Sequence, residues 1–277
     1  MGSNASEKKM TDGGTSGIAR GNFSEIRMTP KLTSKPVARA SDIENFFDQA
    51  AADYREQHGA QEVLLRYRLG LIRSLAQFSA TDLVLEIGTG PGNHLMPLAP
   101  HFASAVGTDI SRRMIEIAKQ RCHEVGLEGK LYFRTDNAEK LESVPAQSMD
   151  VAFCVGAFEH MVDKRAVLLS VARVLRPGGR FVCLTPNGDW LWYRWLAPLL
   201  GLHTTRLSTD RFVGADEVRS SLADCGFHSV RTGYWTFVPR GDMPRVCASV
   251  MDLLDMIGRV AAPRHLRGGL TFYAVRR

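Results

Sequence analysis

Apolar and polar residues follow two different periods along this chain. Seven short runs are apolar enough for buried strands, at residues 83–87, 104–111, 131–134, 150–155, 180–185, from 228 onward and at 270–275. Between most of them, apolar residues recur at three- and four-residue spacing, which is typical of helices that bury one face. Strands that alternate with helices predict a parallel sheet. We therefore expect an α/β fold with a doubly wound, mostly parallel sheet.

The residues before the first strand divide into two parts. Residues 1–40 are rich in Ser, Gly, Lys and Thr and carry seven Lys and Arg against three acids, so we expect a disordered basic tail. Residues 41–78 show two helical patterns, the first with Ser41 or Asp42 as its cap. Nothing divides the rest into comparable halves. The sequence predicts one domain over 41–277, with 41–78 as its N-terminal helical part.

A glycine-rich loop follows the first strand. Gly88, Gly90 and Gly92 lack a Cβ atom, so the backbone can adopt positive φ and approach a ligand, and the helix behind offers unpaired N–H groups. Asn93 stands where the dinucleotide fingerprint has its third glycine. Glu86, at the end of the strand, would repel a pyrophosphate and suits a ligand with a cationic amino group.

Acidic and amide side chains follow the next two strands. Asp109 lies 21 residues beyond Gly88, where an acid can accept hydrogen bonds from ribose hydroxyls. Asp109 could instead cap the following helix, although Ser111 is better placed for that role. The pair Asp136 and Asn137 after the third strand is either an ordinary turn or an acceptor for the amino group of a base.

These motifs together resemble the class I S-adenosylmethionine-dependent methyltransferases, in the type 11 small-molecule group that includes ubiquinone, menaquinone and polyketide methyltransferases. The run 175–179, Leu-Arg-Pro-Gly-Gly, is a further phrase of that family, and the resemblance extends from Phe46 to the C-terminus. It implies a seven-stranded Rossmann-like methyltransferase sheet with helices on both faces, and S-adenosylmethionine as the cofactor. The cofactor-binding residues it implies are Tyr54, Glu86, Gly88, Thr89, Gly90, Gly92, Asp109, Ile110, Met114, Asp136, Asn137, Ala138 and Val155.

The residues after the fourth strand are candidates for the chemistry. His160 follows this strand, where the resemblance implies that the transferred methyl group points. A histidine there either takes the proton of a phenol or enol as a general base or shapes the pocket through hydrogen bonds. The ubiquinone-type enzymes carry a further acid three residues before the Glu-His pair, where this chain has Gly156. No metal site is therefore predicted.

Two apolar insertions depart from the common pattern. Residues 187–213 hold three of the four tryptophans, and residues 241–263 form an apolar, methionine-containing segment. We expect both to form an acceptor pocket. The alternatives for the first insertion are a plain packing helix and peripheral contact with a membrane surface through Trp190, Trp192 and Trp195.

The charge distribution and the cysteines limit the compartments and the binding partners that are expected. The net charge of +6 is concentrated in the tail and in residues 231–277, where it is either plain solvated charge or a surface for nucleic acid or anionic lipid. Five widely spaced cysteines, Cys122, Cys154, Cys183, Cys225 and Cys247, indicate neither a disulfide framework nor a zinc site. We expect a cytoplasmic protein, with membrane association left open.

The expected function is methyl transfer from S-adenosylmethionine to an apolar small-molecule acceptor, such as a phenol, quinone precursor, polyketide or lipid, more often on oxygen, by direct displacement. Such a reaction asks mainly for alignment. The alternatives are a non-catalytic partner protein that binds the cofactor and a nucleic-acid methyltransferase that uses the basic ends. An NAD-dependent oxidoreductase fits Glu86 and Asn93 least well.

Overall fold

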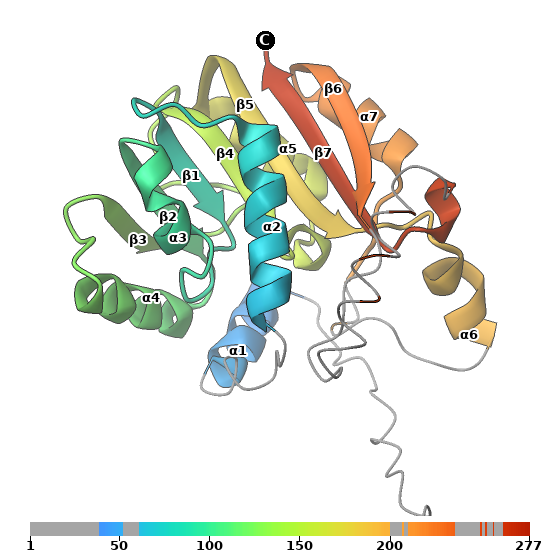
Figure 1. The fold of residues 1–277 in the computed structure, drawn as a ribbon, viewed down its shortest axis with the longest axis horizontal. Coiled ribbons are helices and arrows are strands. Elements are labelled where there is room, and N and C mark those ends of the chain that lie inside the picture. The colour runs from blue at the N-terminus through green and yellow to red at the C-terminus, as the bar shows by residue number, and fades with distance from the viewer. Residues whose placement is uncertain are drawn as a thin grey trace, which may run out of the picture. The chain divides into compact units, whose positions relative to one another are not determined.

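The fold was determined as a computed structural model, shown in Figure 1. The structure describes residues 39–51, 61–199, 207, 210–235, 250, 253, 257 and 263–277. Tyr54, Cys247, nearly all of the expected tail and most of the 241–263 insertion lie outside these residues.

Helices and strands alternate in the order that the sequence predicts. The helices are α1 (Ala40–Ala50), α2 (Gln61–Ala76), α3 (Leu95–Leu98), α4 (Arg112–Glu124), α5 (Lys164–Val174), α6 (Ala197–Leu199) and α7 (Ala215–Asp224). The shorter turns are η1 (Ala99–His101), η2 (Phe158–His160), the π-helical η3 (Trp192–Leu196) and η4 (Arg264–Leu266). The strands are β1 (Leu83–Ile87), β2 (Ser104–Asp109), β3 (Leu131–Thr135), β4 (Met149–Val155), β5 (Leu175–Pro186), β6 (Phe227–Trp235) and β7 (Gly269–Arg276).

The seven strands form one sheet in the order β3-β2-β1-β4-β5-β7-β6. The first five strands of this order run parallel, whereas β7 is antiparallel to both β5 and β6. From β1 the chain adds β2 and β3 on one side of the sheet, and it then adds β4 and β5 on the other side. The strand order therefore reverses between β1 and β4. In open α/β sheets, ligands bind beyond the carboxyl ends of the strands at such a reversal.

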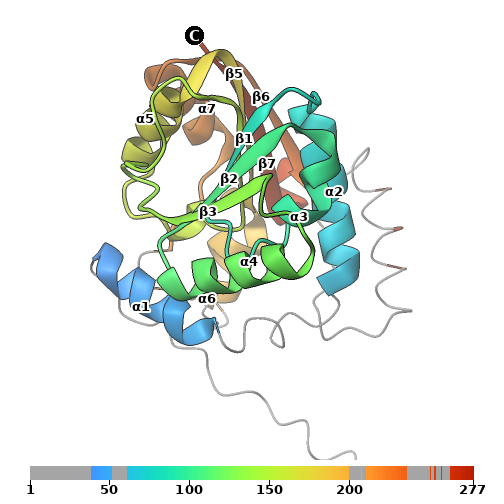
Figure 2. The same ribbon diagram turned by 90° about the vertical axis from the view of Figure 1, so that its left-hand side faces the viewer.

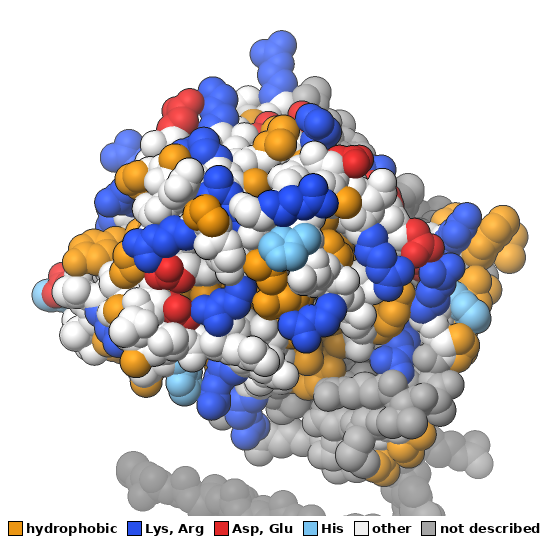
Figure 3. Space-filling model, turned by 90° about the horizontal axis from the view of Figure 1, so that it is seen from above, with side chains coloured by type: hydrophobic (Ala, Val, Ile, Leu, Met, Phe, Trp, Pro, Cys, Tyr) orange, Lys and Arg blue, Asp and Glu red, His pale blue; other side chains and the backbone are white. Residues whose placement is uncertain are grey.

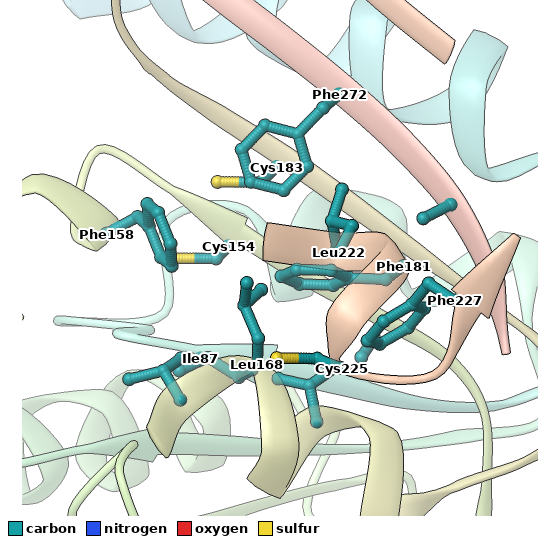
Figure 4. Packing of buried hydrophobic residues seen from close by; sticks show 14 of the residues in the cluster. Ile87, Cys154, Phe158, Leu168, Phe181, Cys183, Leu222, Cys225, Phe227 and Phe272 are labelled. Carbon is teal, nitrogen blue, oxygen red and sulfur yellow. The ribbon is translucent and has the colours of Figure 1, made fainter. Parts of the chain in front are cut away.

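Two buried layers enclose the sheet and confirm the expected helices on both faces. Helices α2, α3 and α4 cover one face, and α5 and α7 cover the other (Figure 2). The α5 side is rich in aromatic rings, with Phe181 between Phe227 and Phe272 (Figure 4). Cys154 and Cys183 are buried in the same cluster with free thiols. Among the described helices, none is long and apolar enough to cross a membrane.

Local details differ from the sequence predictions at two places. Helix α1 begins at Ala40, so neither expected cap, Ser41 or Asp42, is its N-cap. The N-cap is Arg39, whose backbone N–H donates to Asp42 Oδ2 at 3.0 Å. Strand β5 begins at Leu175, whereas the sequence predicts the fifth strand at 180–185, because Leu175 already pairs with Met149. The residues after Leu175 bulge from the sheet until Arg180 resumes the pairing, since four residues, 176–179, must fit opposite Asp150 alone.

A substitution at Gly107 in β2 tests how tightly the sheet packs beneath the glycine-rich loop. A methyl group on Gly107 would lie 2.8 Å from Phe133 Cδ1 and 2.9 Å from Thr89 Oγ1. We expect Gly107→Ala to lower the free energy of unfolding by about 1–3 kcal/mol, because an overpacked core must shift to admit the methyl group. Urea unfolding measures the change. Gly129→Ala is the matched control, because nothing lies within 4 Å of its added methyl group; equal stability of the two variants would contradict the packing argument.

Candidate functional site

A cavity of about 630 Å³ lies beyond the carboxyl ends of β1 to β4. Residues after each of these strands line it, and so do side chains from α1 and α2 and from the insertion that follows β5. The strand reversal therefore coincides with the cavity, as the topology requires. Its size falls within the range of about 300–1,000 Å³ that is usual for pockets that bind small molecules.

The loop after β1 needs its glycines for two separate reasons. Gly88, Gly90 and Gly92 have φ angles of 68°, 52° and 78°, a region in which other residues are strained. A Cβ atom on Gly88 would also overlap the Ala157 side chain, and one on Gly92 would lie 3.2 Å from the Phe133 ring. Gly88 and Gly90 line the cavity, whereas Gly92 packs beneath the loop.

Glu86 holds the loop from below. Its side chain is fully buried; Thr89 Oγ1 donates to Oε2 at 2.6 Å, and His94 Nδ1 lies 2.8 Å from Oε1. Thr89 and His94 line the cavity, but Glu86 itself does not. In this geometry the carboxylate orients two lining residues. A direct contact between Glu86 and a ligand stays a prediction.

Asp109 joins the end of β2 to the glycine loop. Its two oxygens accept hydrogen bonds from Gly90 N at 2.8 Å and from Ser111 N at 2.9 Å, and the side chain lines the cavity. Burial raises the pKa of Asp109 to about 6, although the two backbone donors oppose that shift. Ser111 caps α4 as expected, because its Oγ accepts from Met114 N at 3.1 Å. Asp109 is thus not needed as the cap.

The turn after β3 brings the expected polar pair to the same cavity. Asp136 accepts from the backbone of Ser143 at 2.7 Å and of Glu142 at 3.2 Å, and Asn137 Oδ1 accepts from Glu139 N at 2.9 Å. Both residues therefore shape the turn while they line the cavity. The geometry does not choose between them as the acceptor for a base.

Most of the predicted site residues meet in this cavity. Those that line it are Gly88, Thr89, Gly90, Asp109, Ile110, Met114, Asp136, Asn137, Ala138, Val155 and His160. Glu86 and Gly92 lie behind the lining, and Tyr54 is outside the described residues. Within the described residues, no group of three or more His, Cys, Asp and Glu side chains is placed to hold a metal ion.

The other end of the cavity contains a pair that the sequence analysis missed. His160 Nδ1 lies 2.6 Å from Asp210 Oδ1, and both residues line the cavity. The His160 ring also stands 5.3 Å from the ring of Phe47, which comes from α1. Asp210 is 50 residues away in sequence, inside an insertion that reads as apolar. The polar triplet Thr209-Asp210-Arg211 is the one local signal that could have pointed to it.

The insertion after β5 contributes Tyr193 and Phe212 to the cavity, with their ring centroids 4.5 Å apart. No tryptophan lines the cavity among the described residues. Trp190 is half-buried and packs against Gly268 and the Tyr193 ring, whereas Trp195 is 63% exposed.

Comparisons with known proteins agree with this geometry. A methyltransferase domain family matches residues 85–183. An uncharacterized methyltransferase, YcgJ, of Bacillus subtilis is 35% identical over 114 residues, which are 41% of this chain and 44% of that protein. An O-methyltransferase of Pyrenophora dematioidea is 30% identical over 154 residues, 52% of this chain and 53% of that protein. The chain thus spans about half the length of these curated relatives.

The fold comparison gives a similar structure. The crystal structure of B. subtilis YcgJ superposes with a TM-score of 0.57 at 21% identity, over 76% of this chain and 99% of that one. This likeness concerns the fold alone. Residues 85–183 thus match a methyltransferase domain, and the sheet order and the glycine loop of this chain agree with that match.

Proposed function

We propose that this chain transfers the methyl group of S-adenosylmethionine to an apolar small-molecule acceptor, more often on oxygen. The observation that carries the proposal is that one cavity joins the glycine loop and Asp109 to the His160 end. A nucleoside site and a candidate proton acceptor therefore face the same space. The cofactor supplies an electrophilic methyl group on a sulfonium, so the protein needs mainly to align an acceptor with it.

The donor end offers the right partners for a nucleoside with an amino acid tail. Asp109 keeps lone pairs for ribose hydroxyls beyond those that Gly90 and Ser111 use, because a carboxylate has about four acceptor positions. Ile110 and Met114 offer an apolar flank for a base, and Asp136 or Asn137 accepts from its amino group. Gly88 lets the backbone approach the tail without a Cβ atom in the way.

The acceptor end is mostly apolar and aromatic. Phe47, Tyr193 and Phe212 line it together with Met161 and Pro186, which suits a phenol, quinone precursor or other apolar acceptor. The proposed role of the insertion 187–213 as a pocket wall rests on Tyr193 and on Phe212. The matching role of residues 241–263 stays a prediction, since most of them lie outside the described residues. Preference for oxygen is supported by the similarity to the Pyrenophora O-methyltransferase.

The alternative functions have weaker support. Lys and Arg side chains are spread among uncharged ones over the face seen in Figure 3 and do not gather in one stripe, so that face favours no nucleic-acid groove. A dinucleotide is disfavoured because Asn93 accepts a hydrogen bond from Arg121 at 2.7 Å where the fingerprint needs a glycine. A non-catalytic partner protein would need no acceptor pocket, whereas Phe47, Tyr193 and His160 line the same cavity as the glycine loop.

Methyl transfer is tested on the full chain with S-adenosylmethionine that is labelled in its methyl group. We expect label to enter phenol, catechol or 1-naphthol, and we expect calorimetry to detect S-adenosylhomocysteine but not NADH. Binding without transfer to any acceptor in a panel of phenols, quinols and lipids would favour the non-catalytic alternative. Binding of NADH alone would overturn the assignment.

The raised pKa of Asp109 predicts a pH-dependent affinity. Below its pKa of about 6 the carboxyl is neutral and loses an acceptor position, so affinity falls as pH falls. If only the ionised form binds, the dissociation constant of S-adenosylhomocysteine rises about tenfold from pH 7.5 to pH 5. Calorimetry at both pH values measures it. Asp109→Asn should bind weakly at both, and any pH dependence that this variant keeps belongs to other groups.

We also propose that the protein contacts a lipid surface peripherally. Trp190 and Trp192 are half-buried, so other side chains support this contact. They are the exposed Leu191, just before η3, Trp195 and Leu196 in η3, and Leu199 in α6. We expect the protein to sediment with vesicles of phosphatidylglycerol and phosphatidylcholine, and Trp195→Ser with Leu199→Ser to reduce the bound fraction severalfold. Leu169→Ser, an exposed apolar position on α5, is the control. An equal loss in the control would exclude a specific surface.

A further inference from the structure

The His160–Asp210 pair is more than a contact between two loops. The side chains are nearly buried, with 12% of His160 and 1% of Asp210 exposed, and their Nδ1–Oδ1 distance is 2.6 Å. The second oxygen of Asp210, Oδ2, accepts from Leu207 N at 2.9 Å. Both carboxylate oxygens of Asp210 therefore take part in hydrogen bonds, and the shorter of the two orients the histidine ring.

Asp210 determines which ring nitrogen carries the proton. A carboxylate accepts hydrogen bonds and cannot donate them, so the proton of the neutral ring lies on Nδ1. The lone pair is then on Nε2. Phe47 packs on the ring at an interplanar angle of 60° and restricts its rotation. This arrangement is the one that a general base needs.

The insertion delivers Asp210 to this position through its backbone. Arg211 N donates to the carbonyl oxygen of Glu159 at 3.1 Å, and Gly188 N donates to the carbonyl of Val213 at 2.9 Å. Asn187 and Val213 also form an isolated parallel bridge. The returning end of the insertion is thus fastened both to the turn that carries His160 and to the end of β5.

The charges around the pair point to Asp210 as the group that faces Nδ1. The Glu159 carboxylate instead accepts from Thr185 Oγ1 at 3.2 Å. Lys164 donates to the backbone oxygens of Glu159 and Met161, and the Arg211 side chain pairs with Glu217.

We propose that Asp210 is a positioning residue that holds His160 as the base for a phenolic acceptor; this inference rests on the proposed methyl transfer. The acceptor oxygen gives its proton to His160 Nε2 as it forms a bond to the methyl carbon. The carbon–sulfur bond breaks, and its electron pair stays on sulfur, so the sulfonium becomes a neutral thioether. Asp210 stabilises the imidazolium until the ring releases its proton to solvent.

A phenol is the class of acceptor that this site suits. A phenolic hydroxyl has a pKa of about 10. This value is much closer to the pKa of an imidazole than the pKa of an aliphatic alcohol is. Planar rings also fit the aromatic walls that Phe47, Tyr193 and Phe212 provide.

The first test observes the ring without any acceptor. In full-length protein labelled with ¹⁵N-histidine, with His160→Gln used to assign the signals, we expect wild-type His160 to carry its proton on Nδ1 at pH 8. Asp210→Asn should move the proton to Nε2. In this variant, the single amide oxygen of the new side chain accepts from Leu207 N, so its amide NH2 group must donate to His160 Nδ1. A wild-type proton on Nε2 would overturn the proposal whatever the protein methylates.

The second test separates a base from a structural clamp. Asp210→Asn keeps a hydrogen bond to His160, so a clamp would survive, whereas kcat for catechol should fall by about 10²-fold or more. The KM for S-adenosylmethionine and the calorimetric affinity for S-adenosylhomocysteine should stay within about twofold, since the donor end is untouched. Asp216→Asn, which removes an exposed carboxylate outside the cavity, is the control and should leave kcat unchanged.

The outcomes distinguish this inference from the broader function. Loss of S-adenosylhomocysteine binding in Asp210→Asn, or a kcat within threefold of wild type, would show that Asp210 is not a positioning residue for catalysis. A wild type that binds S-adenosylhomocysteine and methylates only amines would overturn the phenol assignment while it supports methyl transfer. A wild type that does not bind S-adenosylhomocysteine would overturn the proposed function, and the tautomer would still decide the role of Asp210.

Discussion

A fully buried carboxylate at the end of β1 supports the arrangement of the donor end. Glu86 binds Thr89 and His94, which stand at opposite ends of the glycine loop, so the loop is held across its base. The loop in turn donates from Gly90 to Asp109, and this bond ties β1 to the end of β2. A polar group without solvent needs such partners, because burial of an unpaired polar group costs free energy. The network therefore stabilises the loop conformation and shapes the cavity beside it.

The two ends of the cavity are built in different ways. The donor end comes from loops directly after consecutive strands, so its residues are placed by the sheet itself. The acceptor end combines Phe47 from α1, His160 after β4, and Tyr193 and Asp210 from the insertion after β5. A change in the insertion can alter the acceptor pocket without moving the sheet.

The sequence predicted the sheet, and it pointed to residues that share one cavity, because these signals are local. Strand runs, a glycine loop and an acid at a fixed distance all lie within short stretches, and the structure brings Gly88 and Asp109 to one cavity. The partner of His160 could not be predicted in this way, since no local pattern links two residues 50 positions apart. The burial of Glu86 was also missed. A charge that ends a strand reads as exposed unless its partners, Thr89 and His94, are recognised as a set.

The central claim is that one cavity aligns the cofactor, held at Asp109, with an acceptor beside His160 and Asp210. A crystal structure of the full chain with S-adenosylhomocysteine tests it most directly. The account predicts ribose hydroxyls within hydrogen-bond distance of the Asp109 carboxylate, and a sulfur atom that faces the His160 end of the cavity. An adenosine bound away from Asp109, or a sulfur directed away from His160, would contradict it.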